Sequence, residues 1–110
     1  MNNYKYDKPE PPSHLSPEMQ EFWRAVFQRI RIQEFQVHLF QKACEAHDRA
    51  EAARKILDRE GLTFSDRFNQ PRARPEVNIE VLSRAQFQKL LTDCGVHDCF
   101  FQHERREAKS

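Results

Sequence analysis

The residues of this chain that could do chemistry are mainly its arginines and lysines. Such side chains bind phosphate oxygens, and each phosphate that a protein neutralises adds affinity that salt removes. The alternative for each of them is an ordinary solubilising charge on the surface. Candidates for phosphate contacts lie near the N-terminus, in the first predicted helix and in a proline-flanked connector, and are Lys5, Lys8, Arg24, Arg29, Arg31, Arg72 and Arg74.

Catalytic and metal chemistry has little support in the sequence. Its two glycines, Gly61 and Gly95, cannot form a glycine-rich phosphate loop. The serines, histidines and acids show no nucleophile motif, and the acids of the long predicted helix have basic neighbours at helical spacing, which favours a salt-bridged surface. We therefore expect no enzyme and no cofactor. We also expect no metal, because Cys-x-x-Cys spacing is missing from the possible zinc ligands Cys94, His97, Cys99 and His103.

Composition and charge point to a small domain that associates with other copies. Only 38% of its 110 residues are hydrophobic, which leaves little material for a core, and a domain of this size is marginally stable alone. The net charge of +1 is low for a DNA-binding domain. Repeating a weak basic patch around a symmetric oligomer would compensate through avidity.

Cysteine usage and hydropathy favour a cytosolic protein. Three cysteines are an odd and sparse set, which argues for a reducing compartment. No apolar run approaches the about 20 residues needed to cross a bilayer, and the polar residues 1–12 do not resemble a signal peptide. We therefore expect no membrane partner.

The first half of the chain predicts an arm and two helices. Prolines make residues 1–15 an extended, flexible arm. Ser16 is typical of an N-cap before Pro17, and the helix that follows carries the apolar stripe Met19, Phe22, Trp23, Val26, Phe27 and Ile30. A second stripe, ended by Gly61, comprises Ile32, Phe35, Leu39, Ala43, Ala46, Ala50, Ala53 and Leu57.

The alanines of the second stripe would let another helix approach closely. We therefore expect the contact between copies to involve Ala43, Ala46, Ala50, Ala53 and Leu57. His47, at the edge of this stripe, is more typical of a packed or interface histidine than of a metal ligand.

The second half predicts a connector and one more helix. Residues 62–75 are a short β-hairpin or a structured loop. We expect the Asp48–Arg49 pair to form a salt bridge with the Asp66–Arg67 pair, although Arg67 could instead contact DNA. Pro75 begins the last helix and Gly95 ends it, with a stripe of Ile79, Leu82, Gln86, Phe87, Leu90 and Cys94.

Together these elements predict an all-α fold with a helical core over residues 16–95. Two antiparallel helices are followed by the hairpin-like connector, and the third helix packs across them. Residues 96–110 form a polar tail. Its aromatic pair either folds back on the helices or docks on a partner together with nearby arginines, the four residues being Phe100, Phe101, Arg105 and Arg106.

The order of these parts resembles the small terminase subunits of tailed phages and prophages. The likeness covers roughly residues 11–96. It consists of a Pro-Pro arm before Phe22-Trp23, the helical run 43–52, the strand-like link 61–68 that leads to Arg74-Pro75, and the run 86–91 before Cys94-Gly95-Val96. The chain departs from the family at Asn69, where Gly is frequent, and at Cys94-Gly95-Val96, where a Leu-Gly-Leu type segment is common.

The resemblance implies a ring-forming, non-catalytic oligomer in the host cytoplasm, not expected in the mature virion. Such a subunit binds double-stranded viral DNA at the packaging-initiation site and presents it to the large subunit, which holds the ATPase and the nuclease. A contact between the C-terminal tail and the large subunit also follows from the resemblance. The alternative is a structural oligomer or protein-binding adaptor without DNA binding; a small enzyme ranks third.

Overall fold

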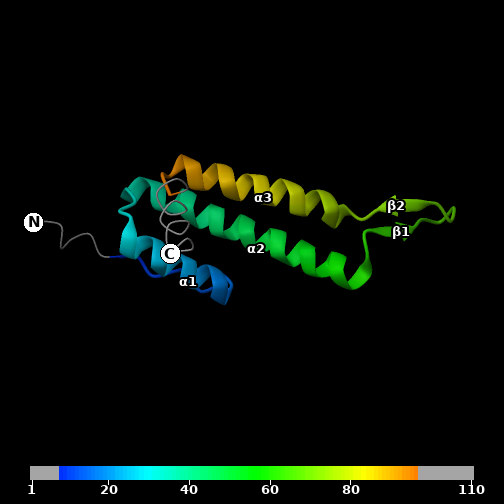
Figure 1. Ribbon diagram of the computed structural model, residues 1–110, viewed down its shortest axis with the longest axis horizontal. Coiled ribbons are helices and arrows are strands. Elements are labelled where there is room, and N and C mark those ends of the chain that lie inside the picture. Colours follow the sequence, from blue (N-terminus) through cyan, green and yellow to red (C-terminus); the bar gives the residue numbers. More distant parts are fainter. Residues whose placement is uncertain (1–7, 97–110) are drawn as a thin grey trace, which may run out of the picture.

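A computed structural model of the chain describes residues 8–96. These residues form three α-helices, a short 3₁₀ turn and a two-stranded hairpin, so the fold is mostly helical (Figure 1). The elements are α1 (Pro17–Arg29), η2 (Glu34–Gln36), α2 (Val37–Glu60), β1 (Thr63–Ser65), β2 (Pro71–Ala73) and α3 (Pro75–Asp93).

Helix α1 begins where the sequence predicts. Ser16 is the N-cap, and its Oγ accepts a hydrogen bond from the backbone N–H of Met19 at 3.2 Å, with Pro17 following at the first helical position. The same hydroxyl donates to Asp48 Oδ1 of α2 at 2.6 Å, and the Ser16 N–H donates to Asp48 Oδ2 at 2.8 Å. The cap thus fixes the start of α1 and also attaches it to α2.

Helix α1 runs antiparallel to the first half of α2. Asp48 lies beside the start of α1, whereas Phe40, eight residues earlier, contacts the rings of Trp23 and Phe27 at 5.0 and 5.6 Å. Trp23, Val26 and Phe40 are buried in the main hydrophobic core. This core occupies one end of the molecule (Figure 1).

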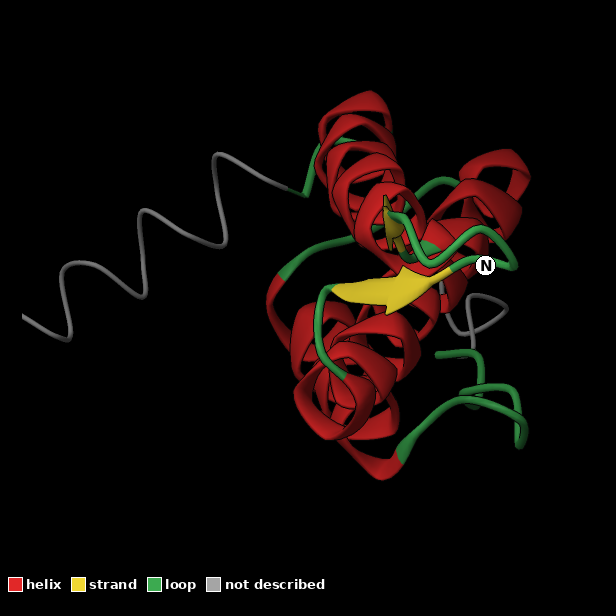
Figure 2. Cartoon of the chain, turned by 90° about the vertical axis from the view of Figure 1, so that its right-hand side faces the viewer, coloured by secondary structure: helices red, strands yellow, loops and turns green. Residues whose placement is uncertain are grey.

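Helix α3 also runs antiparallel to α2 and lies along its length (Figure 1). Arg54 contacts Glu80 near one end of this pair, and His47 stacks edge-on against Phe87 at 5.1 Å closer to the other. The last helix therefore lies along α2 instead of crossing it, and it also meets α1, where the ring centroids of Phe22 and Phe87 are 6.1 Å apart. Figure 2 shows the helices from the hairpin end.

The connector is a true β-hairpin. Strands β1 and β2 pair antiparallel, with Thr63 opposite Ala73 and Ser65 opposite Pro71. In the loop, Asp66 Oδ1 accepts from the backbone N–H groups of Phe68 and Gln70 at 2.8 and 2.9 Å. Asn69 has a φ of 60°, a left-handed conformation that asparagine tolerates better than most residues.

The burial predicted from the apolar stripes is confirmed only in part. Phe35 is 70% exposed because it lies in η2, before the period of α2 begins. Ile79 and Leu82 are also exposed, since the first half of α3 turns polar residues toward α2. Val96 is buried in the core, which therefore extends one residue into the predicted tail. None of the helices in residues 8–96 has the length and apolar character needed to span a membrane.

The alanine stripe is buried inside the chain. Its members, Ala43, Ala46, Ala50, Ala53 and Leu57, are at most 3% exposed in a single copy. Small side chains allow α3 to lie close to α2, which is the effect of alanine that the sequence suggested. A contact between copies through these residues would require α3 to move away from α2.

The Ser16 cap gives a first prediction. Replacing Ser16 by Ala removes the acceptor for Met19 and the donor to Asp48, and we expect unfolding to become easier by about 1 kcal/mol, within the range of N-cap replacements. Urea unfolding followed by circular dichroism measures this change. Ser13→Ala, at an exposed neighbouring serine, serves as the control and should shift stability by less than about 0.5 kcal/mol. Equal effects of the two variants would contradict the role of the cap.

Candidate nucleic-acid interface

A basic pocket lies where α1 ends. It is shallow, has a volume of about 240 Å³, and is lined by Lys8, Phe27, Gln28, Arg29, Ile30 and Arg31. Three of the seven residues predicted to contact DNA therefore share one cavity. Gln28, Arg29 and Arg31 are exposed, and Phe27 forms its apolar floor.

Two local features bring the three cations together. The indole Nε1 of Trp23 donates to the carbonyl of Pro9 at 2.8 Å, which holds the preceding Lys8 against α1. At the other side, Ile30 leaves the helix in an extended conformation, and its N–H donates to the carbonyl of Val26. Residues 8–15, predicted as part of a flexible arm, are thus attached to the helices.

The positive charge of the pocket comes from its side chains and not from the helix dipole. Arg29 lies in the last turn of α1, where the helix dipole is negative and favours a cation. The lining residues, all within the described chain, include three cations and no acid. Arginine can bind a phosphate through two parallel hydrogen bonds, and lysine adds a point charge. The pocket therefore suits an anionic ligand such as a backbone phosphate.

The remaining predicted DNA contacts lie elsewhere. Arg24 is exposed on α1 and does not line the pocket. Arg72 and Arg74 lie at the hairpin, at the opposite end of a molecule that is 67 Å long (Figure 1). Lys5 lies outside the described residues. The structure thus divides the predicted set instead of assembling one patch.

The arginines of the hairpin are paired with acids. Arg72 Nε donates to Asp66 Oδ2 at 2.8 Å, and Arg74 Nη2 lies 3.9 Å from Glu60 Oε1. The hydrogen bond from Arg72, together with backbone N–H groups of the loop, lowers the pKa of the Asp66 carboxyl, which keeps it charged. This pairing reduces the positive field that the hairpin can offer to DNA.

The predicted salt bridge between the connector and the long helix is not formed. Asp48 accepts from Ser16, and Arg49 Nη2 donates to Gln86 Oε1 at 2.8 Å. Arg67 lies over the ring of Phe68, with its guanidinium carbon 4.9 Å from the ring centroid. Position 48 lies beside α1, whereas the connector lies past the far end of α2, so the two pairs cannot meet.

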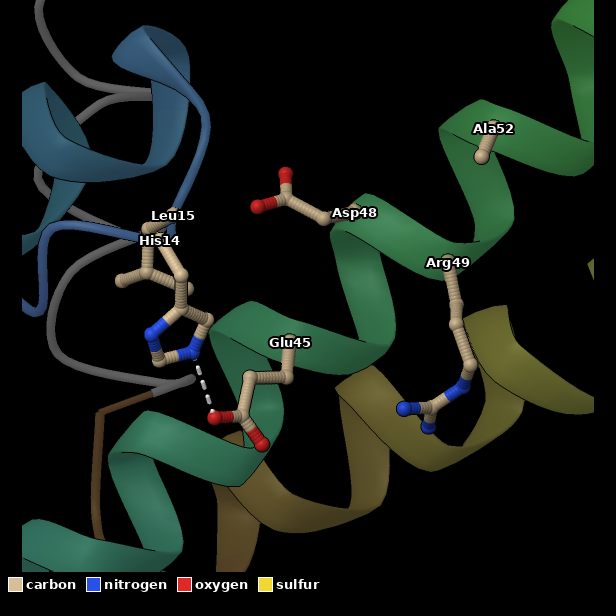
Figure 3. A pocket seen from close by; sticks show the side chains of 6 residues that line it. All are labelled: His14, Leu15, Glu45, Asp48, Arg49 and Ala52. Carbon is tan, nitrogen blue, oxygen red and sulfur yellow. Dashed lines mark hydrogen bonds and ion pairs between the residues drawn. The ribbon is translucent and has the colours of Figure 1, made fainter.

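A second pocket, of about 430 Å³, lies between the start of α1 and the middle of α2 (Figure 3). Sequence reasoning missed it, because His14 and Glu45 lie 31 positions apart and join only when the chain before α1 folds back. His14 Nε2 and Glu45 Oε2 are 2.8 Å apart. Hydrogen bonds from Gln41, then His14, lower the pKa of the Glu45 carboxyl.

The acids around this second pocket hold the fold together. Glu45 is engaged by His14 and Gln41, and Asp48 by Ser16. Across residues 8–96, no three His, Cys, Asp or Glu side chains gather in a way that could hold a metal. Of the four possible zinc ligands, only Cys94 is described, and it is buried in the core. The tail residues Phe100, Phe101, Arg105 and Arg106 lie outside the described residues.

No family model matches this chain, and no curated protein or solved structure does either.

The buried cysteines give a second prediction. Burial, and next the charge of Asp48, raises the pKa of the Cys44 thiol to about 12, and burial also raises the pKa of Cys94. A raised pKa keeps the thiol protonated, and the thiolate is the form that reacts. At pH 8 we expect iodoacetamide to label both residues far more slowly in folded than in urea-unfolded protein, as measured by peptide mass spectrometry. Rapid labelling of folded Cys44 would contradict its burial.

Proposed function

We propose that this chain is the small, non-catalytic subunit of a phage terminase. In this role it binds double-stranded viral DNA at the packaging-initiation site and recruits the large subunit, which carries the ATPase and the nuclease. The proposal rests on the ordered likeness over residues 11–96 and on one feature of the fold, the basic pocket of Lys8, Arg29 and Arg31.

The pocket supports DNA binding because it concentrates cations in an otherwise balanced chain. Elsewhere in residues 8–96, Arg54 and Arg84 contact Glu80, and Lys89 contacts Asp93. Field strength at the surface depends on such local arrangement more than on net charge. A net charge of +1 is therefore compatible with a basic DNA-binding site at one end of the molecule.

Self-association would turn one weak pocket into a useful binding surface. Three cations can neutralise only a few phosphates, which gives low affinity for a single copy. A symmetric oligomer presents the same pocket several times to one DNA molecule, and linked sites gain avidity without new contacts. A homo-oligomer, with a ring as the form that the resemblance implies, therefore belongs to the proposal.

Recruitment of the large subunit is assigned to the C-terminal tail. Phe100 and Phe101 are adjacent aromatic residues in a polar segment, and Arg105 and Arg106 follow closely. Aromatic residues and arginines are enriched at the energetic centres of protein interfaces. This part of the proposal does not depend on the basic pocket, so it can be wrong while the DNA-binding part is right.

The third prediction tests DNA binding. We expect the protein to bind double-stranded DNA with an affinity that falls steeply between low and moderate salt. The double variant Arg29→Ala, Arg31→Ala should bind more weakly and lower the salt slope by roughly 0.9 for each lost phosphate contact. Fluorescence anisotropy with a labelled duplex measures both quantities. The control is Lys55→Ala with Lys89→Ala, which removes two exposed cations away from the pocket.

A third double variant, Arg72→Ala with Arg74→Ala, separates the two ends of the molecule. We expect a smaller loss of affinity than at the pocket, where three cations line one cavity. A larger loss would place the DNA site on the hairpin. Absence of any salt-dependent DNA binding would reject the terminase role and favour a structural oligomer or a protein-binding adaptor.

A further inference from the structure

The end of the molecule that carries the hairpin has an uncovered apolar surface. Helix α1 packs on the first half of α2, so the second half of α2 and the first half of α3 form a two-helix arm (Figure 1). Apart from Phe35, the large hydrophobic side chains that are exposed within residues 8–96 lie in or beside this arm, and are Leu62, Phe64, Phe68, Ile79, Val81 and Leu82. Concentrations of this kind mark interaction sites.

The outer face of α3 is free of charge over three turns. Every exposed residue of this helix from position 78 to position 88 is uncharged, in a chain in which 32% of residues are charged. Val81 and Leu82, at 60% and 61% exposure, lie in the middle of it. This neutral face consists of Asn78, Ile79, Val81, Leu82, Ala85, Gln86 and Gln88.

The charged side chains of this segment, Glu80 and Arg84, contact α2. Glu80 and Arg84 contact each other at 2.9 Å and also reach α2, where Arg84 meets Glu51 and Glu80 meets Arg54. The first half of α3 therefore has polar residues toward its own chain and apolar residues toward solvent. A helix with this reversed polarity is stabilised when a second surface covers its apolar side.

We propose that the neutral face binds the same face of a second copy, with the two α3 helices antiparallel and Leu82 near the two-fold axis. A neutral surface can meet itself without like-charge repulsion. An axis at Leu82 places Asn78 of one helix opposite Gln86 of the other, since both lie four residues from the axis. Gln86 Oε1 accepts from Arg49 of its own chain, and the Gln86 amide N–H groups can donate to Asn78 Oδ1 of the other copy.

Other occupants fit this face less well. DNA requires cations, and the face has none. Helix α1 is engaged with the first half of α2 through Ser16 and Trp23. The C-terminal segment 97–110 contains six Asp, Glu, Lys or Arg residues, which a neutral apolar surface would have to desolvate.

This inference rests on the self-association in the proposed function and makes it more specific. A contact in which the same face meets itself closes on two copies and cannot propagate. Any larger assembly would then contain an even number of copies and would need a second, different contact. An oligomer whose mass is unchanged by Leu82→Glu would overturn this contact alone and leave the DNA-binding proposal standing. A monomeric wild type would also remove the avidity on which that proposal depends.

The experiment begins with molar mass by light scattering after size exclusion. We expect wild-type protein to be a dimer or an even-numbered assembly of dimers, and Leu82→Glu to halve that mass, because it would place two carboxylates together on the axis. Phe35→Glu is the matched control, at a phenylalanine of similar exposure away from the face, and should leave the mass unchanged. Circular dichroism checks that both variants fold.

Cysteine cross-linking tests the geometry of the contact. In a Cys99→Ser background, Leu82→Cys should form a disulfide dimer on mild oxidation, since residues on the axis meet their own copies. Gln88→Cys, six residues from the axis, should not. A monomeric wild type, an unchanged mass of Leu82→Glu, or equal cross-linking at positions 82 and 88 would each overturn the proposal. A reduced mass of Leu82→Glu without cross-linking at 82 would overturn the two-fold arrangement.

Discussion

The unequal lengths of the helices are the constraint on which the rest of the structure depends. Helix α2 has 24 residues and spans about 36 Å, whereas α1 has 13 and spans about 20 Å. Because Ser16 and Asp48 attach the start of α1 near the middle of α2, α1 covers only the first half of its neighbour. A three-helix core can therefore form at one end alone, where Trp23, Phe40 and Leu91 are buried.

At the other end, α2 and α3 have to hold together as a pair. A two-helix layer cannot surround large apolar side chains, and there the chain uses alanine to bring the helices close and ion pairs to join their edges. Glu51, Arg54, Glu80 and Arg84 form one continuous network across this contact. Partly exposed ion pairs contribute little stability each, so the arm depends on Ala50, Ala53 and Leu57 for its packing. The apolar residues left outside by this arrangement are the ones that a partner would cover.

Much of the local structure could be predicted from sequence, and less of its assembly. Ser16-Pro17, Gly61 and Pro75 determine where helices begin and end, because capping depends on adjacent residues. Periodicity also identified the core residues Trp23, Val26 and Phe27. It failed for Ile79 and Leu82, since an apolar stripe shows that a helix needs cover but not whether its own chain supplies it. The alanine stripe shows the converse error: close packing was expected between copies and occurs within one.

The candidate binding site shows why a count of cations is a poor guide to nucleic-acid contacts. Arg72 and Arg74 stood out in the sequence because two prolines flank them, but pairing with Asp66 and Glu60 is visible only once the hairpin closes and α2 ends beside it. Lys8 looked like part of a loose arm, yet the hydrogen bond between Trp23 and the carbonyl of Pro9 holds it next to Arg29 and Arg31. Acids lie beside the arginines of the hairpin, and three cations share one cavity at the core end. In the proposed function, DNA binds at the core end and a second copy binds at the arm end, so both contacts can form at once. That separation is what a subunit needs if several copies are to act together on one DNA molecule.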